Sequence, residues 1–178
     1  MTNGKVKVAT VWLDGCSGCH MSFLDLDEML LTIVEKATIV YGPLVDTQEF
    51  PEGVDVTLVE GAVANQDDLK LVQKIRQNTR VLVALGDCAV TSNVPSMRNW
   101  VPVKKLLERG YIENATETLQ IPKDGVPALL RQAVPVGAVV QVDAHIPGCP
   151  PSAAAIGKAL LDIAAGQPPK LAGMVKFG

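Results

Sequence analysis

The stretch KVKVATVWLDGCSGC, residues 5–19, decides the fold of this chain. Lysine and valine alternate at its start, and the run then stays apolar up to Leu13. This change is typical of a strand that enters a sheet buried on both faces. Two cysteines follow the strand almost at once, so we expect the strand to deliver Cys16 and Cys19 to one end of the sheet.

Similar strands and helical stripes continue along the chain. We expect further strands at residues 38–41, 54–59, 80–85 and 139–142, and helices at residues 21–34, 66–77, 103–109 and 152–165. The last helix is expected to begin with Pro150 and Pro151 in its first turn. Strands that alternate with helices predict an α/β fold, an open and mostly parallel sheet with helices on both faces.

The chain is expected to form a single domain over residues 1–178, because its length supports one substantial core. Prolines interrupt residues 91–135, at positions 95, 102, 122, 127 and 135. We therefore expect an irregular, partner-facing segment there. A positive mean hydropathy of +0.23 also points to a permanent protein partner.

Charge and composition exclude several classes of function. The net charge of -3 gives no basic surface for nucleic acid or an anionic membrane. Arg131 and two prolines break the most apolar later window, residues 126–142, so no membrane span is expected. The first ten residues carry neither a long apolar run nor a twin-arginine pair, which favours a cytoplasmic location. Neither GxGxxG nor GxxxxGK[ST] occurs, so nucleotide binding has no support.

The four cysteines form three groups, each a few residues after an expected strand: Cys16 with Cys19, then Cys88, then Cys149. The carboxyl ends of parallel strands meet at one edge of a sheet, so three loops could gather four thiolates. A [4Fe-4S] cluster needs such a set. A four-thiolate zinc site and a redox pair formed by Cys16 and Cys19 alone are the alternatives.

Glycines beside the cysteines favour the cluster. Gly15, Gly18, Gly86 and Gly148 let the backbone approach a bulky inorganic group and turn its N–H groups toward sulfur. The helix expected at residues 152–165 would direct the positive end of its dipole at an anionic cluster.

Four motifs then resemble, in order, the cluster-binding motifs of nickel-iron hydrogenase small subunits. They are CSGC at residues 16–19, EGAV at 60–63, GDCA at 86–89 and PGCPP at 147–151. The resemblance spans nearly the whole chain and implies a flavodoxin-like fold. It also implies one proximal [4Fe-4S] cluster whose ligands are Cys16, Cys19, Cys88 and Cys149.

Two departures from the family pattern refine this interpretation. Exported respiratory hydrogenases carry additional clusters in a cysteine-rich extension, whereas the cysteines here are all used by one cluster. The chain therefore resembles the small subunit of cytoplasmic NAD-reducing, bidirectional hydrogenases. The cluster subunit of complex I normally has adjacent cysteines, unlike CSGC, and it remains an alternative together with deazaflavin-coenzyme-reducing and sulfur-reducing hydrogenases.

The resemblance implies a subunit of a hydrogen:NAD oxidoreductase that passes electrons and contains no catalytic residue. Two CxxC pairs of the large subunit hold the nickel-iron centre in this family, and this chain has one pair. The expected partners are that large subunit and a diaphorase carrying further iron-sulfur clusters, FMN and the NAD site. An FMN in this chain lacks support, because cysteines replace the Ser/Thr-rich phosphate loop. A zinc-stabilised interaction module and a thiol-disulfide enzyme are the alternatives from other classes.

Residues beside the cysteine loops have two interpretations each. Glu60 ends a strand, where it could lie at the large-subunit interface or on a proton path, or could accept backbone N–H groups. His20 and His145 are expected to hydrogen-bond to sulfur or to backbone. Trp12 and Trp100 are expected in the core or as interface anchors.

Overall fold

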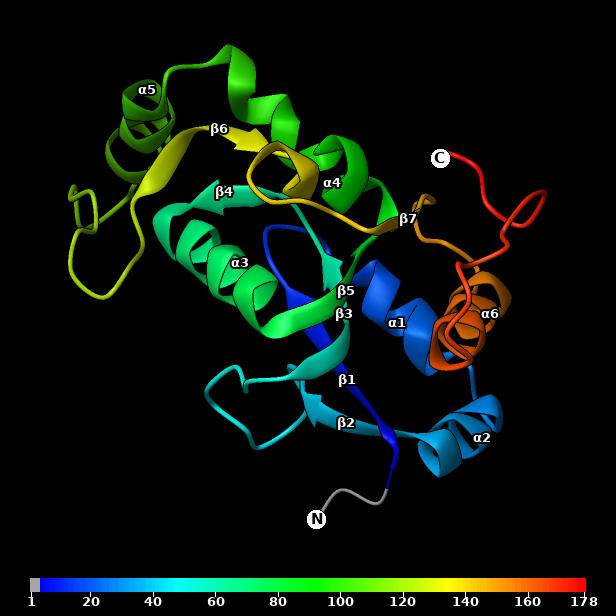
Figure 1. Ribbon diagram of the computed structural model, residues 1–178. Coiled ribbons are helices and arrows are strands. Elements are labelled where there is room, and N and C mark those ends of the chain that lie inside the picture. The colour runs from blue at the N-terminus through cyan, green and yellow to red at the C-terminus, as the bar shows by residue number, and fades with distance from the viewer. Residues whose placement is uncertain (1–3) are drawn as a thin grey trace.

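A five-stranded parallel sheet forms the centre of the computed structural model, which describes residues 4–178 (Figure 1). Its spatial order is β2-β1-β3-β5-β7. The strands are β1 (Val6–Trp12), β2 (Ala37–Tyr41), β3 (Val54–Glu60), β5 (Thr79–Leu85) and β7 (Ala144–Ile146). This is the strand order of flavodoxin-like sheets, so the expected fold class is confirmed. The start of the chain, residues 1–3, on which the prediction of a cytoplasmic protein partly relied, lies outside the described residues.

Helices cover both faces of the sheet, as the apolar strands predict. One face, with Val56 and Leu58, packs against α1 (Gly18–Leu24), α2 (Met29–Lys36) and α6 (Ala153–Ala164). The other face, with Val59 and Leu82, packs against α3 (Gln66–Asn78) and the short 3₁₀-helix Val136–Ala138. Adjacent residues of β3 thus enter opposite cores, which explains why this strand is apolar without alternation.

The prediction of a single helix over residues 21–34 is wrong, because the structure has two helices there. Asp27 adopts a left-handed conformation with φ 47° and separates α1 from α2. A turn with i→i+3 hydrogen bonds follows α1, in which the N–H of Leu26 donates to Phe23 and the N–H of Asp27 donates to Leu24. The apolar spacing suggested one continuous helix because Phe23 and Ile33 pack in the same core, although they belong to two separate helices.

The strand expected at residues 139–142 is also wrong. Residues 139, 140 and 142 are valines that pack partly buried on the α3 face without joining the sheet. The last strand is β7, which starts two residues later, after Asp143 accepts a hydrogen bond from the Leu82 backbone N–H at 2.7 Å. Tertiary packing rather than strand pairing buries these valines.

The last helix differs in how it begins. Pro150 and Pro151 precede the helix and do not occupy its first turn. Ser152 caps α6 instead, and its Oγ accepts the N–H of Ala155 at 3.3 Å. The expected range of this helix is otherwise confirmed.

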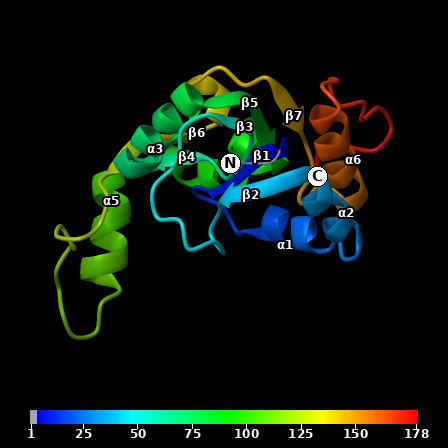
Figure 2. The ribbon, with the colours of Figure 1, turned by 60° about the horizontal axis from the view of Figure 1, so that its bottom comes forward.

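Residues 91–135 are more regular than expected. After α4 (Gly86–Thr91) they contain the 3₁₀-helix Val94–Trp100, then α5 (Val103–Glu108) and a π-helical turn, Arg109–Glu113. The segment ends with β6 (Leu129–Val134), which pairs antiparallel with β4 (Val63–Asn65) as a second, two-stranded sheet. Figure 2 shows α5 and the loop after it extending away from the body of the fold. Pro95 lies in the first turn of the 3₁₀-helix, and the other four prolines fall between elements, so the irregular interpretation was only partly correct.

No helix among residues 4–178 combines the length and the apolarity that crossing a membrane would require.

The start of α3 provides a test of the fold. The Asn65 side chain accepts the N–H groups of Asp67 and Asp68, each at 2.9 Å, and the Asp68 carboxylate bonds back to Asn65. We expect Asn65→Ala to destabilise α3 by about 1 kcal/mol, or roughly fivefold faster amide exchange over residues 66–78. Hydrogen-exchange mass spectrometry measures this. Gln73→Ala, at an exposed position of the same helix, should leave the exchange rate unchanged.

Candidate functional site

Three chain segments bring the cysteines to the carboxyl edge of the sheet. The first follows β1: Leu13 donates to the Glu60 carbonyl at 2.9 Å, and Asp14 pairs with Ala62 through two backbone hydrogen bonds. Cys16 lies in the following loop and Cys19 in the first turn of α1, after Ser17 in a left-handed conformation. Cys88 lies in α4, directly after β5, and Cys149 follows β7.

The four thiols are free and lie within electrostatic range of one another. Cys19 and Cys88 are buried, whereas Cys16 and Cys149 are exposed. Burial raises the pKa of Cys19 to about 12, and the negative charges of Glu60 and of the other three cysteines add to this. Burial raises the pKa of Cys88 as well, with further contributions from Cys16 and Cys149. The structure therefore gathers all four predicted cysteines at one site.

At two positions near the cysteines, any side chain larger than that of glycine would clash with its neighbours. A Cβ atom on Gly86, whose φ is +81°, would overlap the sulfur of Cys19. A Cβ atom on Gly148, whose φ is +142°, would lie 2.6 Å from the backbone of Pro151. Backbone conformation and space thus both require glycine beside Cys88 and Cys149.

Glu60 holds the loop of the first two cysteines. Its side chain is buried, and its Oε1 accepts the N–H of Ser17 at 2.9 Å. Its Oε2 lies 2.7 Å from Nδ1 of His20. Acceptance of a backbone N–H, one of the two interpretations of Glu60, is therefore present in the structure.

The surroundings of the histidines and tryptophans were predicted less well. His20 bonds to a carboxylate, not to sulfur or backbone as expected, and its ring lies edge-on to Trp12 at 5.3 Å between centroids. His145 is exposed on β7. Both tryptophans are exposed, Trp100 by 91%, so the core interpretation is wrong for them.

Asp87 is the residue of the site that sequence reasoning missed. Its buried carboxylate accepts the N–H of Gly148 at 2.7 Å and the N–H of Gly178 at 2.8 Å. It therefore ties the segment of Cys88 to the loop of Cys149. The available signal was an acidic residue placed directly before a cysteine at the start of a helix.

Polar side chains also lie close to Cys149. The amide nitrogen of Asn93 donates toward the Cys149 sulfur at 3.7 Å. The Ser22 hydroxyl donates to the carbonyl of Pro151 at 2.5 Å, which fixes α1 against the chain after Cys149. The loops that carry Cys19 and Cys149 are thus joined by a direct hydrogen bond between their flanking residues.

The donor set fits an iron-sulfur cluster. It consists of four cysteine sulfurs from three loops, with glycine backbone packed against the sulfurs, as a [4Fe-4S] cluster requires of its protein. Across residues 4–178, no three His, Cys, Asp or Glu side chains are arranged as a site for a single metal ion. Buried thiols with raised pKa values favour the neutral form, so a positively charged group is needed to hold them as thiolates.

Comparison with known proteins gives consistent results. Residues 16–163 match the family model described as "NADH ubiquinone oxidoreductase, 20 Kd subunit". The delta subunit of the NAD-reducing hydrogenase HoxS of Cupriavidus necator is 39% identical over 93% of this chain and 81% of its own length. A vhu subunit of the F420-non-reducing hydrogenase of Methanocaldococcus jannaschii is also 39% identical, but the chain spans only 58% of its length.

Solved structures agree with the sequence comparison. A chain of an NAD+-reducing [NiFe]-hydrogenase in the H2-reduced state superposes with a TM-score of 0.93 at 35% identity, covering 98% of this chain and 99% of that one. A chain of the [NiFeSe] hydrogenase from Desulfovibrio vulgaris Hildenborough, at 17% identity and a TM-score of 0.57, shares the fold.

The sheet order and the cysteine loops at its carboxyl edge define a flavodoxin-like subunit of the hydrogenase type. The chain belongs to the family of the NADH:ubiquinone oxidoreductase 20 Kd subunit, in which its relatives are hydrogenase subunits. The resemblance drawn from the four motifs, and the expectation of a hydrogenase subunit, are confirmed.

The tight packing at Gly86 can be tested with a matched glycine. Gly86→Ala and Gly125→Ala both place a side chain at positive φ, +81° and +74°, at a shared cost of about 1–2 kcal/mol. Only Gly86→Ala also overlaps Cys19, because nothing lies within 4 Å of the Gly125 position. We expect Gly86→Ala alone to speed alkylation of Cys19 by about tenfold or more, measured by peptide mass spectrometry. Equal alkylation rates in both variants would contradict the packing described here.

Asp87 provides a second test. Asp87→Asn keeps one acceptor but presents an NH₂ group to the other backbone N–H, which should weaken the loop by about 1–3 kcal/mol. We expect faster amide exchange in the peptide that contains Gly148, and no change there in Asp124→Asn, a variant of an exposed loop residue. Unchanged exchange at Gly148 in Asp87→Asn would mean that the hydrogen bond does not hold the loop.

Proposed function

We propose that this chain is the electron-transfer small subunit of a cytoplasmic NAD-reducing nickel-iron hydrogenase. It would form one domain over residues 1–178 and carry one proximal [4Fe-4S] cluster on Cys16, Cys19, Cys88 and Cys149. The observation that carries the proposal is the gathering of four free thiols, from three loops, at the carboxyl edge of one parallel sheet.

A bound [4Fe-4S] cluster supplies one-electron transfer. The residues of this chain supply its ligands and keep them in position. Glu60 fixes the loop of Cys16 through the Ser17 N–H, and Asp87 fixes the loop of Cys149 through Gly148. Buried surroundings on the side of Cys19 and Cys88 exclude water, while the exposed Cys16 and Cys149 mark the side that faces a partner.

The proposed partners are a large subunit with the nickel-iron centre and a diaphorase with further clusters, FMN and the NAD site. This chain has a single CxxC pair, so hydrogen activation is assigned to the large subunit and no catalytic residue to this chain. Exposed apolar side chains on residues 91–135, among them Met97 and Trp100, support a partner-facing role for that segment. Glu60 remains a candidate for the interface or for a proton path.

The choice of NAD over other acceptors rests on the superposition with the chain of the NAD+-reducing enzyme, which has a TM-score of 0.93 over 98% of this chain. The chain spans 54–58% of the length of three F420-non-reducing relatives from Methanocaldococcus jannaschii and Methanothermobacter species. A subunit of an F420-non-reducing hydrogenase is the second candidate, because one such relative is equally identical in sequence. An FMN bound by this chain has no support from the loop after β1, which carries Cys16 and Cys19.

Metal analysis tests the cluster. Purified without oxygen, the complex should be brown, should contain about four iron and four sulfide per copy of this chain beyond those of its partners, and should show the EPR signal of a reduced cluster. Cys88→Ser should lose or convert that signal. Stoichiometric zinc on this chain in place of iron would instead support the zinc-stabilised module.

The proposed place in the electron path has its own test. Within the intact complex, Cys16→Ser should abolish H2-driven NAD reduction, because electrons from H2 must pass this chain to reach NAD. Oxidation of NADH by artificial dyes at the diaphorase should remain, and it serves as the internal control for folding and assembly. H2-driven NAD reduction that survives loss of the cluster would refute the proposed role.

A further inference from the structure

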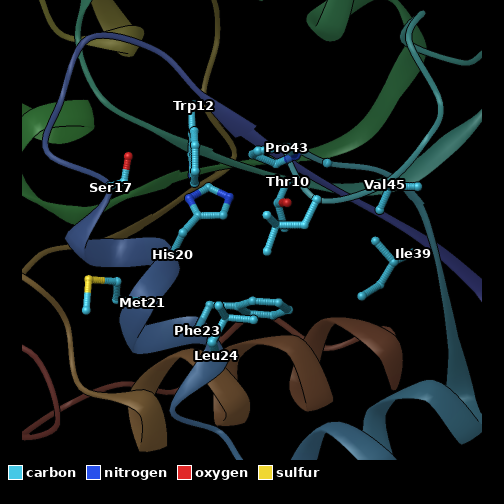
Figure 3. Close-up of a pocket in the computed structure, with 12 residues that line it drawn as sticks. Thr10, Trp12, Ser17, His20, Met21, Phe23, Leu24, Ile39, Pro43 and Val45 are labelled. Carbon is cyan, nitrogen blue, oxygen red and sulfur yellow. The ribbon is translucent and has the colours of Figure 1, made fainter.

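An apolar pocket lies beside the loop of Cys16 and Cys19, between α1 and the chain that follows β2 (Figure 3). Its volume is about 370 Å³, within the range of sites that enclose a ring-sized group. Thr10, Phe23, Ile39 and Val45 line its interior. Its lining residues include no Asp, Glu, Lys or Arg, so the pocket suits an uncharged occupant.

The rim of the pocket is an exposed apolar surface. Leu44 is 71% exposed and Met21 66%, and Leu24 and Trp12 are also exposed. Together with the pocket they form a continuous apolar patch of a kind that usually marks a protein contact. A small molecule within the pocket would leave this rim uncovered, whereas a protein surface covers both.

One polar atom in the pocket wall has no partner. His20 is only 5% exposed, and its Nε2 makes no hydrogen bond. The ring lies between Trp12 and Thr10, with one nitrogen directed toward Thr10 and Pro43 (Figure 3). A buried nitrogen without a partner is costly, so the pocket calls for an occupant that bonds to it.

The contacts of Glu60 leave Nε2 as the free nitrogen of the ring. The Glu60 carboxylate accepts the N–H of Ser17 and lies 2.7 Å from Nδ1 of His20. Nδ1 thus already has a partner, and Nε2 offers either a lone pair or an N–H, according to the tautomer and protonation of the ring. A hydroxyl group both donates and accepts, so it bonds to Nε2 in either case.

We propose that the partner subunit inserts a tyrosine side chain into this pocket and that its hydroxyl group forms a hydrogen bond with Nε2 of His20. Tyrosine combines an apolar ring with one hydroxyl group, and it is a common anchor of protein interfaces. The inference rests on the proposed function, in which this partner is the hydrogenase large subunit. Ser17 joins the two sites, since it lines the pocket and lies between Cys16 and Cys19.

A negative charge introduced at the rim of the pocket provides the first test. Leu44→Glu places a carboxylate at the mouth of the pocket, and Leu31→Glu places one on α2, at a residue of nearly equal exposure, 67%. We expect Leu44→Glu to raise the dissociation constant of the complex with the large subunit by about tenfold or more, and Leu31→Glu to change it by less than about threefold. Equal effects of the two variants would overturn the proposal.

Cross-linking identifies the anchor directly. A benzoylphenylalanine incorporated at position 44 of the intact complex should link to a large-subunit peptide that contains tyrosine. The same group at position 31 should not link to that peptide. Cross-links confined to this chain, or to a peptide without tyrosine, would overturn the proposal.

A double-mutant cycle then tests the hydrogen bond. Once the anchor is located, its replacement by phenylalanine should weaken the wild-type complex by about threefold to tenfold, but should have little further effect when His20→Phe has already removed Nε2. Additive effects of the two changes would mean that Nε2 does not bind the anchor.

The remaining outcomes separate this inference from the proposed function. An iron-containing complex in which Leu44→Glu binds as well as Leu31→Glu overturns the anchor alone. A wild-type chain that purifies without any partner overturns both. A flavin or other aromatic compound released in stoichiometric amount on denaturation, and lost in Leu44→Glu, would replace the anchor by a small-molecule site.

Discussion

The structure depends on holding four sulfur atoms close together at one edge of a sheet. Thiolates repel one another, and two of the four are also removed from water, so their gathering is unfavourable without compensation. The fold meets this constraint with backbone rather than with positive side chains. Each cysteine segment follows a strand of the parallel sheet, which is covered on both faces. The rigid sheet therefore fixes where these segments begin.

Two buried carboxylates then hold the loops, although the charge of Glu60 adds to the repulsion. Glu60 raises the pKa of Cys19, yet it also fixes Ser17 and His20. Asp87 joins the Cys88 segment to Gly148 and reaches the backbone of Gly178. A carboxylate that accepts backbone N–H groups is stabilised locally, which makes these two acids anchors of defined geometry. Loops held in this way are prepared for a group that is larger than a single ion.

The same edge of the sheet also carries the surfaces that need a partner. The exposed rim around Leu44 lies beside the loop of Cys16, and the exposed Met97 and Trp100 follow α4, which holds Cys88. The surfaces suited to protein contact thus adjoin the site of the four cysteines. A partner that covers them would lie close to the four sulfur atoms.

The sequence by itself determined the strands β1, β3 and β5, the helices α3 and α6, and the gathering of Cys16, Cys19, Cys88 and Cys149, because these follow from local apolar patterns and from the parallel connection of strands. Only the tertiary structure decided which apolar run joins the sheet beside β5. Residues 139–142 are richer in valine than β7, yet β7 pairs with β5, directly after the hydrogen bond between Asp143 and Leu82. The bonds of Glu60 to His20 and of Asp87 to Gly148 join residues 40 and 61 positions apart. Such contacts depend on how loops meet in space, which no periodicity within a short stretch of sequence records.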